Sequence, residues 1–188
     1  ALVVVLALLG GAGWWFLGRD GGDDSTEADW VTVNTGTDTF EVSLPSEPDR
    51  RQEEYSLSGL QTLTAHISSI GDTNLDQVAE GVVFVDVDLS QGQFGTLLGN
   101  PQLSMATAVS QARDLFVRAG VTVGTESTST TELGPTARIE GTVPESGLTV
   151  RGGVVVAKGH VLGLMVADPS EARAESRFDR ILDSITLS

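Results

Sequence analysis

Apolar positions recur with two different periods along the chain, and the two periods predict different elements. Phe40, Val42 and Leu44 alternate with polar residues, which is the two-residue period of a strand with one buried face. Residues 104–119 and the last residues of the chain instead repeat their apolar positions at three- and four-residue steps, as a helix does. The order of strands, helix, strands and helix predicts an α+β domain, in which an antiparallel sheet is flanked by helices as an α/β/α sandwich.

Nine segments carry the strand pattern, and their composition indicates their places in the sheet. Residues 51–57 are polar and are expected at an edge, whereas 148–157 and 160–166 are nearly all apolar and are expected at the centre. The predicted strands are 30–33, 40–44, 51–57, 63–68, 81–89, 121–131, 137–141, 148–157 and 160–166. Turn residues between 34 and 38 make the first two of them a hairpin.

Both predicted helices have start and stop signals. Ser104 is the expected N-cap of the first helix and Gly120 its stop. Asp168 is the expected N-cap of the second, with Pro169 at its first helical position. Its apolar stripe is Phe178, Ile181, Leu182 and Ile185, and its solvated face is Arg173, Glu175, Arg177, Asp179, Arg180 and Asp183.

An uncharged apolar run, residues 1–17, precedes this domain and predicts a single transmembrane helix. The run begins with Ala rather than Met, so we expect the span to be N-terminally truncated. Aromatic residues at 14–16 suit a membrane interface. Residues 18–29, with five acidic residues and no large apolar residue, predict a flexible acidic linker, and 30–188 are then the domain.

A cleaved signal peptide is the alternative for the same run, with small residues at 11–13 as its cleavage site. The apolar run continues beyond that point, which favours the anchor. Arg19 is the only basic residue on the C-terminal side before Arg50. The positive-inside rule therefore favours a single-pass protein of the cell membrane, with residues 30–188 outside the cytoplasm.

The charge and composition of the chain exclude some classes of binding partner. The formal net charge is −15, from 11 basic and 26 acidic residues, which excludes a nucleic-acid partner and a domain lying flat on anionic lipid. The chain has no cysteine, so it has no disulfide framework and no N-terminal lipidation site. Lys158 is its one lysine, an arginine bias typical of high-GC actinobacteria. We expect a monomer.

Short motifs at both ends of the domain carry a family resemblance. They are F-x-V-x-L-P-x-x-P at 40–48, R-x-x-G at 138–141 and R-F-x-x-I-L-D-S-I at 177–185. Together with the valine-rich strand and the mid-chain helix, they make residues 30–187 resemble bacterial PsbP-like domains. That fold is shared with the photosystem II protein PsbP and a Ran-binding nuclear transport factor. The resemblance implies binding and assembly more often than catalysis and offers no catalytic residue. Some actinobacterial envelope lipoproteins of similar fold are thought to bind hydrophobic ligands.

Few residues suggest chemistry. Asp86 and Asp88 lie two apart on one strand face and could meet one cation or share a proton. No further ligands can be placed beside them, so we expect a strand end that runs into solvent. His66 and His160, the two histidines, are expected as ordinary sheet residues, because neither cysteine nor H-E-x-x-H accompanies them.

Other motifs are incomplete or absent. Asp72, Asn74 and Asp76 resemble the start of a calcium loop, but the glycine and the bidentate glutamate of such a loop do not follow. The chain has no G-x-S-x-G, no P-loop and no dinucleotide fingerprint. We therefore expect no catalytic, cofactor-binding or metal-binding residues, no cofactor, and no enzyme activity.

Three classes of function remain. The first is a membrane-tethered extracytoplasmic binding or accessory domain with an envelope protein as its partner. The second is a carrier or sensor of a hydrophobic ligand, such as a lipid, held between sheet and helix. The third is a hydrolase that uses Asp86, Asp88 or a histidine, and convergence of a histidine with carboxylates in a cleft would favour it.

Overall fold

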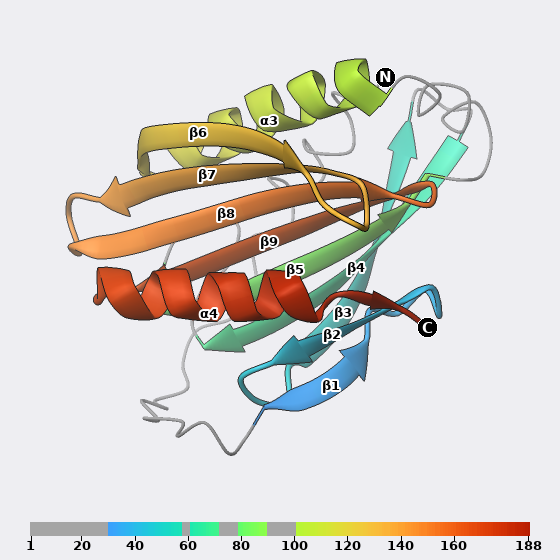
Figure 1. The fold of residues 1–188 in the computed structure, drawn as a ribbon, viewed down its shortest axis with the longest axis horizontal. Helices are drawn as coiled ribbons and strands as arrows, with labels where there is room; N and C mark the ends of the chain where they lie inside the picture. The colour runs from blue at the N-terminus through green and yellow to red at the C-terminus, as the bar shows by residue number, and fades with distance from the viewer. Residues whose placement is uncertain (1–29, 58–60, 72–78, 90–100) are drawn as a thin grey trace.

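A seven-stranded antiparallel sheet forms the body of the protein (Figure 1). The structure is a computed structural model and describes residues 30–57, 61–71, 79–89 and 101–188. Every neighbouring pair of strands in this sheet is antiparallel. The strands follow the spatial order β3 (Asp49–Leu57), β4 (Gln61–Gly71), β5 (Gly81–Asp88), β9 (His160–Asp168), β8 (Leu148–Ala157), β7 (Pro135–Val143) and β6 (Thr122–Thr130).

Two helices and a small second sheet cover the large sheet. The helix α3 (Pro101–Arg118) runs along β6 and β7, and α4 (Glu171–Ser184) crosses β8 and β9 (Figure 1). The small sheet has the order β1 (Val31–Asn34), β2 (Phe40–Leu44) and β10 (Thr186–Leu187). It lies on the same side as α4, because β2 contacts α4 and their apolar side chains share one cluster.

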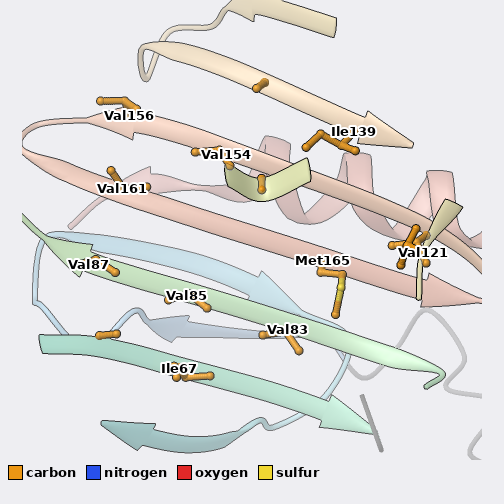
Figure 2. Close-up of a cluster of buried hydrophobic side chains, with 14 of the residues drawn as sticks. Ile67, Val83, Val85, Val87, Val121, Ile139, Val154, Val156, Val161 and Met165 are labelled. Atoms are coloured by element: carbon orange, nitrogen blue, oxygen red, sulfur yellow. The ribbon is translucent and has the colours of Figure 1, made fainter. Parts of the chain in front are cut away.

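Each face of the large sheet has its own apolar core. On the α3 face, side chains such as Ile67, Val85, Val154 and Met165 meet in one cluster (Figure 2). On the α4 face, Phe84 joins the apolar residues of the small sheet and of α4. Because successive residues of a strand point to opposite faces, a strand buried on both sides is apolar throughout. This accounts for the valine-rich composition of β5 and β8.

Adjacent glycines in β8 bring the two helices close to the sheet at one place. A Cβ atom at Gly152 would overlap the ring of Phe116 in α3, and one at Gly153 would lie 2.7 Å from Cζ of Phe178 in α4. Since neighbouring residues of a strand face opposite ways, α3 and α4 lie on opposite faces. The rings of Phe116 and Phe178 therefore pack directly against the backbone of Gly152 and Gly153.

Most of the sequence-based fold prediction is confirmed. The antiparallel sheet flanked by helices is observed, and the first two predicted strands pair as the hairpin of β1 and β2. The polar segment 51–57 belongs to the edge strand β3, and β9 is the central strand. The short β10 was not predicted, because two residues carry no readable period.

Two helix starts were predicted wrongly. The first helix begins at Pro101, so Ser104 lies inside it and is not its N-cap. Proline favours the first helical position because its missing N–H has no partner to lose there. The second helix begins at Glu171 with Ser170 as the N-cap, whose hydroxyl accepts from the N–H of Arg173. Asp168 is instead the last residue of β9.

Several predictions fall outside the described residues. They are the transmembrane helix at 1–17, the acidic linker at 18–29, and the calcium-loop fragment of Asp72, Asn74 and Asp76. In the part of the chain that the structure describes, no helix has the length and apolar character needed to cross a membrane.

Candidate functional site

The carboxylate of Asp86 is fully buried on the α4 face of the large sheet. Asp86 lies in β5 on the same face as Phe84, and its exposed fraction is 0%. Its Oδ2 accepts hydrogen bonds from the hydroxyls of Thr35 at 2.5 Å and Thr37 at 2.6 Å, and its Oδ1 lies 2.8 Å from Nδ1 of His160. The prediction that this strand end runs into solvent was wrong for Asp86. The segment that follows β1 covers it.

That covering segment is a tight turn between β1 and β2. The side-chain oxygen of Asn34 accepts from the N–H groups of Gly36 at 2.7 Å and Asp38 at 3.3 Å, which is an Asx-type turn. Gly36 has φ +103°, and a Cβ there would overlap His66. Only glycine suits both conditions. The turn therefore lies directly on the sheet and aims its threonine hydroxyls at Asp86.

His160, at the start of β9, is buried with an exposed fraction of 4%. Burial by itself lowers the pKa of His160, but the hydrogen bond that His160 donates to Asp86 and the charges of Asp86 and Asp88 outweigh it. The net result is a pKa above the ordinary 6.5. Nε2 of His160 lies 3.9 Å from Asp88, whose side chain is 32% exposed. The ring of Phe40 meets the imidazole edge-on, at 5.2 Å between centroids.

His66 does not join this group, although it lies opposite Asp86 in the pairing of β4 with β5. Its ring nitrogens lie 3.1 and 3.3 Å from Nε2 of Gln52 in the edge strand β3. Within the described ranges, no three histidine, aspartate or glutamate side chains are arranged to hold a metal ion.

The Asp86–His160 pair resembles the orienting half of a catalytic triad, but the hydroxyls are placed differently. In a triad the nucleophilic hydroxyl bonds to the histidine, while the carboxylate orients the histidine from its other side. Here the hydroxyls of Thr35 and Thr37 bond to the carboxylate itself. The arrangement ties the β1–β2 turn to the sheet and activates neither hydroxyl.

A second buried carboxylate, Asp168, was missed by the sequence reasoning as a polar centre. It has an exposed fraction of 0% and accepts from the N–H of Ser170 at 2.7 Å, Nε of Arg173 at 3.0 Å and an Nη of Arg177 at 2.9 Å. Arg177 was predicted on the solvated face of the helix, yet it bonds to this buried group. The spacing D-x₄-R-x₃-R, which places both arginines on one face of the helix, is the signal that could have revealed it.

The two edges of the large sheet differ in charge. The edge strand β3 carries Arg50, Arg51, Glu53 and Glu54. At the opposite edge, residues 124–130 of β6 are all exposed and include one charged residue, Glu126. An edge strand that lacks charges and proline is open to pairing with another strand.

Comparisons with known proteins find similarity to solved structures at low sequence identity. No family model matches the chain, and no curated protein matches it. One similar solved structure is the cyanobacterial PsbP (CyanoP) of Synechocystis, with 13% identity, a TM-score of 0.43, and coverage of 92% of this chain and 99% of that one. Another is a Pseudomonas aeruginosa protein of unknown function, with 11% identity, a TM-score of 0.39, and coverage of 84% of this chain and 96% of that one. The first is a PsbP protein, and similarity at these TM-scores carries no argument about this chain.

Proposed function

We propose that the protein is a binding or accessory domain of the cell envelope, held at the membrane by residues 1–17 and spaced from it by residues 18–29. The uncharged apolar run and the acidic linker support the tether. The arginine bias supports an actinobacterial source. In this proposal the domain of residues 30–188 lies outside the cytoplasm and presents its surface to other envelope components.

One observation favours a binding role over a hydrolytic one. The pair with the most catalytic character, Asp86 and His160, is enclosed, with exposed fractions of 0% and 4%. General acid–base work requires a titrating group within hydrogen-bond reach of the substrate. Here the side chains of Asp86 and His160 bond to each other, and Asp86 also accepts from the turn hydroxyls. Such an arrangement is typical of a structural network.

The tether is tested by washing and truncation. The full chain should remain with membranes after high-salt and alkaline washes, because the attachment is apolar rather than ionic. A chain that starts at Asp29 should be soluble and monomeric. A mature chain that begins near Trp14 and washes free would instead establish the cleaved signal peptide.

The binding role is tested by complementation of a deletion strain. Removal of residues 1–17 alone should abolish function, whereas His160→Gln should reduce it only as far as it lowers the folded fraction. Phe178→Ala, which destabilises the same core and leaves Asp86 and His160 unchanged, is the matched control. Complete loss of function in a well-folded His160→Gln chain would favour acid–base chemistry. Lipid recovered with the purified domain would favour the hydrophobic-ligand carrier.

A further inference from the structure

The edge strand β6 presents a straight, exposed stretch of backbone. Its pairing with β7 is irregular between Val123 and Glu126 and regular from Glu126 to Thr130. Residues 124–130 are all exposed, with the side chain of Glu126 at 29%, and no strand among the described residues pairs with β6 on its other side. The regular part is long enough for several main-chain hydrogen bonds to an added strand.

The hydrogen-bond pattern shows which backbone groups of β6 face outward. The N–H of Thr131 donates to Gly134 at 2.9 Å and the N–H of Gly134 donates to Thr131 at 3.1 Å, so these residues form a hydrogen-bonded pair. Bonded and non-bonded pairs alternate along an antiparallel ladder. Ser129 and Ser127 therefore bond to β7. The residues whose N–H and C=O groups point away from β7 are Glu126, Thr128 and Thr130.

Beyond the irregularity between Val123 and Glu126, this edge lacks the features that prevent strand addition. Proteins protect exposed edges with charges, proline or bulges. The other edge, β3, has five charged residues between Asp49 and Glu54, interrupted only by Gln52, and Pro48 precedes it. From Ser127 to Thr130, by contrast, β6 has neither a charge nor a proline. Glu126, the charged residue that precedes this segment, forms an ion pair with Arg113 of α3 at 3.3 Å.

We propose that β6 binds an extended segment of another envelope protein, which adds to the sheet as an eighth strand through main-chain hydrogen bonds. This deepens the binding function proposed above and rests on it. The net charge of −15 selects a neutral or basic segment and opposes a second copy of this chain. Residues 124–130 also have no apolar side chain, whereas stable homodimer interfaces bury much apolar surface.

The absence of cysteine makes this testable by site-specific cross-linking of the full chain. Ser127→Cys, on β6, and Glu175→Cys, exposed on α4, are each labelled with a thiol-linked photoreactive group. Each labelled chain is then irradiated with solubilised envelope of the source cell. Thr128→Pro removes an outward N–H and leaves the β7 ladder intact, and Thr128→Ala is its matched control. Thr130→Pro is the second variant, should the first not fold.

We expect a discrete adduct from position 127 that survives Thr128→Ala and falls about tenfold with Thr128→Pro, the loss expected for one main-chain bond. An adduct that is equally strong in both variants, or one of twice the mass of the chain, would overturn the added-strand proposal. An adduct from position 175 with none from 127 would overturn it and leave the binding function in place. No adduct at either position would count against both.

Discussion

Asp86→Asn tests whether the buried carboxylate is a structural centre. The substitution keeps the size of the side chain but exchanges an acceptor oxygen for an NH₂ donor. The amide oxygen can still accept from Thr35 and Thr37, but the NH₂ then faces His160, which has no acceptor when it is charged. Loss of a charge-assisted bond in a fully buried site is expected to cost about 2–4 kcal/mol. That is a large part of a typical domain stability of about 5–15 kcal/mol.

The pH dependence gives this prediction a second signature. The pKa of His160 lies above 6.5 in the folded protein, so its contribution to stability is full below pH 6.5 and is lost as the pH rises through the folded pKa. In Asp86→Asn, burial lowers the pKa of His160 with only Asp88 opposing it. The variant should therefore lose the decline in stability above pH 6.5 and be further weakened in acid.

The assay is urea unfolding of the chain from Asp29 onward, followed between about pH 5 and pH 9, the range in which histidine titrates. Asp88→Asn is the control, because Asp88 lies 3.9 Å from His160 with a side chain 32% exposed, and it should cost under about 1 kcal/mol. Equal costs for the two variants, or the same pH slope in Asp86→Asn as in the parent, would refute the structural reading.

Three further substitutions, with Gly124→Ala as a control, test the α3 and α4 faces by thermal or urea unfolding. Phe178→Ala should cost roughly 3–5 kcal/mol, because the ring is 2% exposed; a cost under about 1 kcal/mol would contradict the α4 core. Arg177→Ala should cost about 1.5 kcal/mol, since it removes a donor from a buried carboxylate; no measurable cost would contradict that bond. Gly152→Ala should cost about 1–3 kcal/mol by forcing Phe116 away, whereas Gly124→Ala, with 3.6 Å to its nearest atom, should be nearly neutral; equal costs would contradict the close approach of α3.

The sequence predicted elements well because each period is a local property. The alternation of Phe40, Val42 and Leu44 identifies one strand without reference to any other, and the same holds for the apolar stripe of α4. Helix starts were predicted less accurately, because Asp168, Pro169 and Ser170 are three successive residues that are all typical of a helix start. Only the structure shows that the carboxylate of Asp168 is committed to Arg173 and Arg177.

The candidate site could not be predicted, because it depends on which strands become neighbours. Asp86 and His160 are 74 residues apart, and they meet only because β9 is inserted beside β5. Thr35 is 51 residues from Asp86 and reaches it from a different sheet. Neither separation leaves a periodic signal. The sequence could show two carboxylates on one strand face, but not the turn that encloses one of them.

The adjacent glycines of β8, Gly152 and Gly153, separately control the distance from the sheet to α3 and the distance from the sheet to α4. An added methyl group at Gly152 overlaps Phe116 first, and one at Gly153 overlaps Phe178 first, with the carbonyl oxygen of Ala137 next at 3.4 Å. The spacing between sheet and α3 can thus be altered independently of the spacing between sheet and α4, by changing one of two consecutive residues. If a partner binds at β6, beside α3, a substitution at Gly152 should disturb that side of the domain, and one at Gly153 the opposite side, where α4 lies.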